Sequence, residues 1–329
     1  MWEIPAIKQT IFIMTPLLLA ATGGLFSELA GVLNIALEGL MLNSAFFSIL
    51  FSVLTGNIYL GLTLGVASTL LLTLILGFVS LYLKANIFIS GLATNLFAAS
   101  LSIVLSQKIF GQTGSISFPN MPTLPTVNIP GIERIPVLGN LLSGHNILVY
   151  ISWLILIIAS IIIYHTPFGI RLRATGFDYE AAKSLGLQPR LMQLWSLVIS
   201  GFTCGLAGGF LTLSLGAFVP NVTAGRGWIA LVVIYLGNRT TGGLLIGSLI
   251  FGLVEYLSNY LQASSNIPSG LLLALPFFAT VIAMIIYSVF ENRFRFQVRS
   301  RMLSLTSSSP QSEPVSQEKK DSTGEEKKL

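Results

Sequence analysis

Long apolar runs, separated by short polar breaks, make up most of this chain and restrict the folds open to it. The first 290 residues contain only ten Lys or Arg and seven Asp or Glu side chains. Charged residues are 9% of the whole chain, whereas soluble domains carry about 25%. A helix that crosses a bilayer needs about 20 mostly apolar residues, and several runs here reach that length. The sequence therefore predicts an all-α, polytopic bundle of membrane helices.

The apolar runs predict about nine membrane spans, and their length allows eight to ten. The predicted spans are Ile7–Ser27, Leu33–Leu54, Ile58–Leu83, Ile87–Gln107, Ile147–His165, Leu191–Ala217, Gly227–Leu236, Gly242–Leu261 and Gly270–Phe290. They form one transmembrane domain over residues 1–290, and residues 291–329 form a basic, then polar tail too poor in apolar residues to fold. Because no basic segment or cleavage site marks a signal peptide, we expect the first span to be retained.

One internal polar segment, Phe168–Arg190, separates two of the apolar runs. Six of the charged side chains lie in it: Arg171, Arg173, Asp178, Glu180, Lys183 and Arg190. Asp178 is a favourable N-cap, and Gly186 is placed to end a helix, so we expect a short amphipathic helix over Asp178–Leu185. Such a helix between spans suits docking onto an aqueous partner. A solvated loop that only joins two spans would use the same residue types.

The basic residues predict the orientation of the chain in a cell membrane. If the polar segment within residues 166–190 is cytoplasmic, Lys84, Arg239 and the basic tail also fall inside, as the positive-inside rule requires. The N-terminus and the Pro- and Gly-rich loop 111–146 then lie outside, and the C-terminus lies in the cytoplasm. This distribution accounts for the net charge of +5 without a nucleic-acid partner.

Two weak patterns concern how the helices are arranged. Ile89–Leu92 and Pro268–Leu271 share a Ser-Gly-Leu sequence and open the fourth and ninth predicted spans. Two spans that lie five apart in the chain cross the membrane in opposite directions, so this similarity suggests an inverted repeat. The same offset would pair the second span with the short seventh. Gly201, Gly205 and Gly209 recur at every fourth position and predict a flat helix face for close packing.

Acidic and amide side chains within the apolar runs are the candidates for a substrate path. A charge at the bilayer centre costs about 2.5–3.5 kcal/mol, so such residues face a protein interior or a water-filled path. Gly31 and Gly39 flank Glu38 and suggest an interrupted helix start. A buried polar network that locks helices together, or an interfacial Arg–Trp anchor, would use the same residue types. The candidates are Asn34, Glu38, Asn43, Asn95, Arg226, Trp228 and Glu255.

Motifs that carry chemistry are absent from the sequence. No GxxxxGK[ST] loop is present, so the chain does not bind ATP by that route, and neither HExxH nor GxSxG occurs. The single cysteine, Cys204, excludes an intrachain disulfide and a CxxC metal site. We therefore expect no enzymatic activity, metal or cofactor in this chain.

Three segments together carry a family resemblance. SELAGVLNIALEGLMLNSAFF (Ser27–Phe47), FGIRLRATGFDYEAAKSLGL (Phe168–Leu187) and NVTAGRGWIAL (Asn221–Leu231) resemble permease subunits of ABC importers. The resemblance spans about residues 10–290 and is to the branched-chain amino acid, ribose and simple-sugar superfamily, closest to its nucleoside branch linked to basic membrane proteins. Ala36 stands where the family has glycine, and Leu29-Ala30 replaces a more polar pair.

The resemblance implies a function and a set of partners. It implies an importer with a separate ATPase subunit, which binds ATP and Mg²⁺, and an extracytoplasmic substrate-binding lipoprotein. It also implies a second, homologous permease, and the nucleoside branch favours a heterodimer of the two permeases. It also implies that Leu33–Gly39 opens a helix beside the translocation path. A coupling helix that contacts the ATPase would comprise Asp178, Tyr179, Glu180, Ala181, Ala182, Lys183, Ser184, Leu185 and Gly186.

Nucleosides are the expected substrate, and ribose or another simple sugar is the alternative within the family. From a different class, a secondary transporter would move protons through Glu38 and Glu255. A membrane scaffold without transport activity fits less well, because it would need neither intramembrane acids nor interrupted helices.

Overall fold

The computed structural model describes residues 3–118, 123–128, 143–264, 268–285 and 287–288. Seven helices in these residues are long and apolar enough to cross a membrane. They are α1 (Glu3–Leu29), α2 (Leu37–Thr55), α3 (Ile58–Gly77) with its π-helical extension η1 (Phe78–Tyr82), α4 (Ile87–Phe110), α6 (Ile147–His165), α9 (Pro189–Leu215) and α11 (Thr241–Ser264). The predicted tail, residues 291–329, lies outside the described residues.

Two shorter apolar helices complete the described part of the bundle. They are α10 (Arg226–Leu236) and a helical run over Gly270–Ile285 that overlaps α12 (Ser269–Leu273). Together with the seven longer helices they match the predicted spans one for one. The all-α polytopic fold expected from the sequence is thereby confirmed.

Local capping explains where several helices begin and end. The Oδ1 atom of Asn57 accepts hydrogen bonds from the backbone N–H groups that start α3, and Asn86 does the same for α4. Such caps satisfy donors that have no partner inside the helix. Gly111 follows α4 with a φ of 70°, a left-handed conformation that glycine adopts at little cost. The polar residues between the apolar runs therefore set the helix boundaries.

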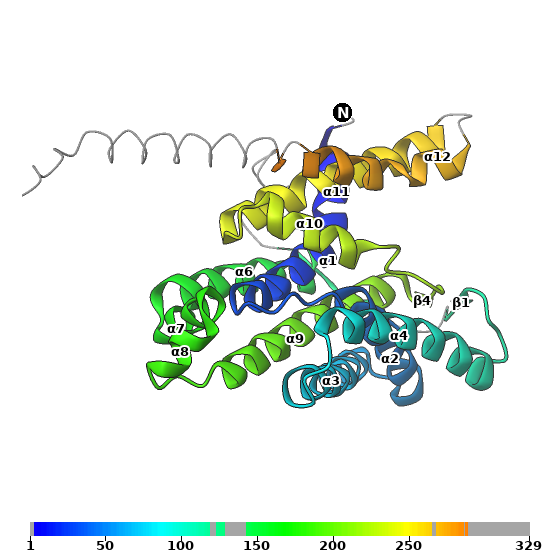
Figure 1. The fold of residues 1–329 in the computed structure, drawn as a ribbon. Coiled ribbons are helices and arrows are strands. Elements are labelled where there is room, and N and C mark those ends of the chain that lie inside the picture. The colour runs from blue at the N-terminus through cyan, green and yellow to red at the C-terminus, as the bar shows by residue number, and fades with distance from the viewer. Residues whose placement is uncertain (1–2, 119–122, 129–142, 265–267, 286, 289–329) are drawn as a thin grey trace, which may run out of the picture. The chain divides into compact units, whose positions relative to one another are not determined.

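Helices α1, α2 and α9 form the buried centre of the bundle. Figure 1 shows α1 between α9 on one side and α10 and α11 on the other. Helix α2 packs against both α3 and α9. The predicted glycine face is confirmed, since Gly201 lies against Thr73 and Gly205 against Val66 of α3. A Cβ on Gly201 would come 2.2 Å from Thr73 Oγ1, so glycine is what lets these helices approach closely.

The chain is interrupted twice near the centre of this bundle. Residues 30–36 leave helical geometry between α1 and α2, as the glycines flanking Glu38 indicated. Residues 219–225 form a second non-helical stretch before α10. Both α2 and α10 thus begin inside the protein.

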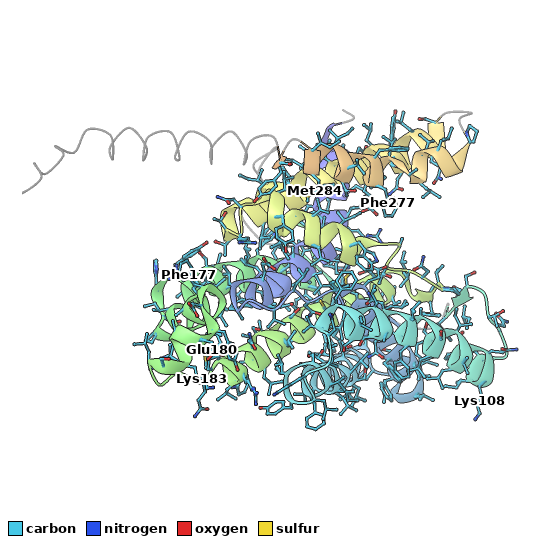
Figure 2. All side chains as sticks on the ribbon, viewed as in Figure 1. Lys108, Phe177, Glu180, Lys183, Phe277 and Met284 are labelled. Atoms are coloured by element: carbon cyan, nitrogen blue, oxygen red, sulfur yellow. The ribbon has the colours of Figure 1, made fainter. Side chains whose placement is uncertain are left out.

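Short elements join the helices at opposite ends of the bundle. At one end, α7 (Pro167–Phe177) and α8 (Tyr179–Ser184) connect α6 to α9. At the other, β1 (Ile116–Ser117) pairs with β4 (Ala217–Phe218) and β2 (Thr126–Val127) with β3 (His145–Asn146), both antiparallel. Figure 2 shows Lys108, near the end of α4, at the far end from Glu180 and Lys183. The sequence predicted α8, but neither α7 nor these two-residue strands.

Candidate functional site

The carboxylate of Glu38, in the first turn of α2, caps the start of α10. Its Oε1 accepts hydrogen bonds from Thr223 Oγ1 at 2.6 Å and from the Gly225 N–H at 2.8 Å. Its Oε2 accepts from the Gly227 N–H at 2.7 Å. The side chain is buried, with 9% of its surface exposed. A carboxylate at a helix N-terminus satisfies free N–H groups and balances the positive end of the helix dipole, which is how an acid is held inside this bundle.

Gly227 makes that capping contact possible. A Cβ on this residue would lie 2.4 Å from the Glu38 nitrogen and 2.6 Å from its Cα. No side chain fits at such separations, so only glycine allows α2 and α10 to meet here. The second glycine of the NVTAGRGW segment therefore has a steric origin.

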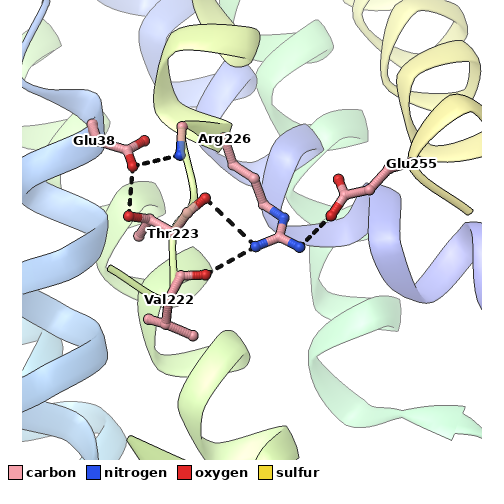
Figure 3. Close-up of polar contacts among 6 residues, drawn as sticks. Glu38, Val222, Thr223, Arg226 and Glu255 are labelled. Atoms are coloured by element: carbon pink, nitrogen blue, oxygen red, sulfur yellow. Dashed lines mark hydrogen bonds and ion pairs between the residues drawn. The ribbon is translucent and has the colours of Figure 1, made fainter. Parts of the chain in front are cut away.

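Arg226 extends this polar chain from α10 to α11. Its guanidinium donates to the Val222 carbonyl at 3.0 Å and forms an ion pair with Glu255 of α11. The side chains of Arg226 and Glu255 are 18% and 17% exposed. Figure 3 shows the resulting line of contacts from Glu38 through Thr223 and Arg226 to Glu255. Three helices that begin or pass at this point are thus connected through charged side chains.

The loop that carries these contacts has an unusual backbone. Asn221, Ala224 and Gly225 all have positive φ, at 58°, 45° and 81°. For a residue with a Cβ, the left-handed conformation costs about 1–2 kcal/mol, and such residues cluster at functional sites where the surrounding structure holds them. The bonds from Glu38 to this loop supply that restraint.

A cavity of about 470 Å³ opens beside the polar chain. Its volume lies within the range of about 300–1,000 Å³ typical of small-molecule sites. It is lined by Glu38, Arg226, Glu255 and Trp228 from the predicted set, and by Asn221, Asn259 and Phe277 among others. The structure therefore brings together four of the seven residues expected along a substrate path.

The other three predicted residues lie outside this cavity and hold the start of α2. Asn95 of α4 accepts from the Gly39 N–H at 2.7 Å and donates to the Ile35 carbonyl at 2.9 Å. Asn34 donates to Ser200 Oγ of α9 at 2.9 Å. The Nδ2 atom of Asn43 donates to hydroxyl groups of α3. These amides support the interrupted segment rather than line the cavity.

Sequence reasoning missed some of the residues that shape this site. Thr223 lies within the NVTAGRGW segment, where its hydroxyl could have been paired with a buried acid. Phe277 carries no signal of this kind, because it is one of many aromatic residues in a long apolar run. Its ring lies 2.9 Å from where a Cβ on Gly225 would be, a contact made only by tertiary packing.

The predicted short helix in the polar segment is confirmed as α8. The Asp178 side chain accepts from the Ala181 N–H at 2.9 Å, and Gly186 follows the helix with a φ of 80°. Of the predicted coupling residues, Ala182 is buried, Tyr179 is half-buried and the others are exposed. Two apolar residues beside the charged ones, Phe177 and Leu185, are 94% and 81% exposed. Exposed apolar and charged side chains thus lie side by side on the surface around α8.

Helix α7 connects this surface to the interruption before α2. A Cβ on Gly176 would lie 2.2 Å from the Leu29 carbonyl oxygen, so the two backbones are in direct contact. The amide of Gln193, in α9, donates to the Ala30 carbonyl at 3.3 Å. Nearby, Arg239 forms an ion pair of 2.9 Å with Glu28 of α1. The segment that precedes Glu38 is thus held by the elements next to α8.

Comparison with known proteins gives a consistent result. The profile of a family described as the permease component of branched-chain amino acid transport systems matches residues 6–289. The guanosine ABC transporter permease protein NupQ of Bacillus subtilis is 33% identical over 84% of this chain and 90% of its own.

Two further relatives cover most of their own length. The nucleoside ABC transporter permease protein NupC of Lactococcus lactis is 28% identical over 85% of this chain and 91% of its own. A putative glucose ABC transporter permease protein of Haloferax volcanii is 31% identical over 79% of this chain and 78% of its own.

Proposed function

This chain belongs to the family of permease components of branched-chain amino acid transport systems, and we propose from that premise that it carries nucleosides as the transmembrane subunit of an ATP-driven ABC importer. The nucleoside assignment rests on its similarity to the guanosine and nucleoside permeases of Bacillus subtilis and Lactococcus lactis. The observation that carries the proposal is the cavity beside the Glu38, Arg226 and Glu255 chain.

The length of α10 supports a position of this cavity deep in the membrane. An α-helix rises about 1.5 Å per residue, so the Arg226–Leu236 helix covers about half of the roughly 30 Å hydrocarbon core. With Arg239 near the cytoplasmic surface, Arg226 would then lie near the bilayer midplane. Substrate sites formed by interrupted helices near the midplane are a recurring design of transporters. Asn34, Asn43 and Asn95 would serve the path by holding α2 in place.

Coupling to ATP hydrolysis would use the exposed surface around α8. The ATPase subunit, which would bind ATP and Mg²⁺, would seat Asp178–Gly186 together with Phe177. Movement of this segment would reach Leu29 through Gly176 of α7, and from there the interrupted segment that leads to Glu38. Closure of the ATPase dimer would in this way change the shape of the cavity that Glu38 lines.

The remaining subunits and the orientation follow from the same proposal. A substrate-binding lipoprotein would dock outside, near residues 111–118 and the strand pairs. A second, homologous permease would complete the path, as a heterodimer. The N-terminus would lie outside and the C-terminus in the cytoplasm. Lys108 lies at the opposite end from Glu180 and Lys183, which supports their lying on opposite sides of the membrane, and the direction itself rests on the positive-inside rule.

Two alternatives make different predictions. The Haloferax volcanii relative is described as a putative glucose permease, so a simple sugar is the second candidate substrate. A proton-coupled transporter is less favoured, because both candidate acids already have partners. Glu38 accepts three hydrogen bonds, and Glu255 forms the ion pair with Arg226.

The deciding experiment is uptake into proteoliposomes that contain the complex of this chain, its partner permease and the ATPase, with the binding protein added. We expect saturable, ATP-dependent uptake of labelled guanosine that excess ribose does not reduce. Uptake of ribose without uptake of guanosine would show that the substrate is a simple sugar and not a nucleoside. Uptake that does not depend on ATP and is abolished by a protonophore would show that the protein is not part of an ATP-driven importer.

A further inference from the structure

The charges around the cavity are already balanced by partners within the protein. Arg226 is paired with Glu255, and Glu38 accepts from Thr223 and from the N–H groups at the start of α10. Two acids and one base line the space, and the positive end of the α10 dipole offsets roughly half a charge. An anion that entered this cavity would therefore find no unpaired cationic side chain and would meet a slight net negative charge.

Two amide side chains at the cavity have no such partner. Among the described residues, the side chains of Asn221 and Asn259 line the cavity, are exposed and form no hydrogen bond. An amide offers both donors and an acceptor. The Nε atom of Arg226 is also buried without a partner in the described part of the chain. The two exposed amides can bind an uncharged ligand that presents donors and acceptors side by side.

Two aromatic rings line the same cavity. Trp228 of α10 is 39% exposed and Phe277, in the helical run Gly270–Ile285, is 46% exposed. Figure 2 labels Phe277 on that helix. Aromatic side chains stack on any nucleobase because each base has a π-face, and one such contact is worth about 1–3 kcal/mol. The lining therefore combines flat apolar surfaces with uncharged hydrogen-bonding groups.

From these observations we propose that this cavity binds the base of an uncharged nucleoside, with Trp228 and Phe277 stacking on it and Asn221 and Asn259 bonding its edge. The Arg226–Glu255 pair makes the site reject phosphorylated forms. This inference rests on the proposed function and names the residues that distinguish a nucleoside from its phosphorylated forms. Glu255 contributes by occupying the guanidinium that would otherwise attract a phosphate.

The test measures binding directly, with the purified complex in lipid nanodiscs and without the binding protein. Guanosine is titrated while tryptophan fluorescence is recorded, and the same complex carrying Trp228→Phe is the blank, so that the difference reports on Trp228. We expect saturable quenching of this difference signal. Phe277→Leu should raise the Kd for guanosine about tenfold, and Asn259→Leu should raise it about three- to tenfold.

Matched controls lie next to the test positions. Phe278→Leu and Gln262→Leu change neighbouring exposed residues that do not line the cavity, so guanosine binding should equal that of the unchanged complex. Because Phe277 and Asn259 are themselves exposed, their replacement does not threaten folding. If the test variants and the controls bind guanosine alike while guanosine uptake persists, the inference is wrong and the proposed function stands.

Discrimination against phosphorylated ligands is tested by a separate binding measurement. The unchanged complex should bind guanosine 5′-monophosphate at least about tenfold more weakly than guanosine, and Glu255→Gln should narrow that gap by freeing Arg226. An unchanged gap in Glu255→Gln would overturn the role assigned to the ion pair. If the unchanged complex imports ribose and not guanosine, the proposed substrate and this inference both fail.

Discussion

At the scale of single residues, the site depends on close approach as much as on charge. Glu38 can cap α10 only because Gly227 leaves room for its backbone. An acid in an apolar span is costly unless every polar atom is bonded. The bonds that Glu38 accepts supply that compensation, so the residue stabilises the meeting of α2 and α10 instead of opposing it.

We expect Gly227→Ala to disrupt this meeting. The added Cβ would lie 2.4 Å from the Glu38 nitrogen, and relief of such overlap in a packed interior costs about 1–3 kcal/mol. The thermal midpoint of the purified protein should fall and guanosine uptake should be lost. Gly242→Ala is the matched control, because a Cβ there meets nothing within 4 Å. Equal stability of the two variants would contradict the steric argument.

We expect Glu38→Gln to weaken the same contact without a change in size. One carboxylate oxygen becomes an NH₂ group, which cannot accept from the backbone N–H it now faces, so a buried donor loses its acceptor at a cost of about 1–3 kcal/mol. The thermal midpoint should fall, and ATP-dependent uptake should decline without becoming sensitive to a protonophore. Unchanged stability would show that the cap contributes little.

At the scale of elements, the polar segment between α6 and α9 consists of two helices with different surroundings. Helix α8 and the exposed side chains of Phe177 and Leu185 form the outward surface. Helix α7 packs against the end of α1, where Gly176 lies on the Leu29 carbonyl. In the proposed function, α8 would receive the ATPase and α7 would pass its movement on to α1.

Changes in α8 and in α7 should therefore have different effects. Replacing Glu180 and Gly186 together should leave membrane insertion intact but separate ATP hydrolysis from transport, because the docking surface is altered. Hydrolysis and uptake measured in the same proteoliposomes would show this as continued hydrolysis with little uptake. Normal uptake with both residues replaced would reject the coupling assignment.

Gly176→Ala tests the second step of that route. A Cβ would lie 2.2 Å from the Leu29 carbonyl oxygen and would push α7 from α1. ATPase association measured by co-purification should persist, while uptake falls. Gly114→Ala, where a Cβ meets nothing within 4 Å, is the control. Loss of ATPase association in Gly176→Ala would instead indicate that α7 shapes the docking surface itself.

At the scale of the whole molecule, the proposed orientation places the α8 surface and the far end of α4 on opposite sides of the membrane. The single cysteine, Cys204, is buried, which suits labelling with introduced cysteines. In a Cys204→Ala background, Lys183→Cys should be labelled by a membrane-impermeant maleimide only after cells are opened. Lys108→Cys should be labelled in intact cells. The reverse pattern would invert the topology.

The sequence by itself determined the class of fold, the approximate ranges of the apolar helices, and the short helix capped by Asp178. These depend on apolar length and on caps within a few residues, which are local properties. Tertiary structure alone decided that Glu38 meets Gly227, 189 positions away, that Arg226 pairs with Glu255, and that Phe277 covers the same cavity. Which residues share a cavity depends on the packing of helices distant in sequence, and close backbone approach at glycine sets that packing.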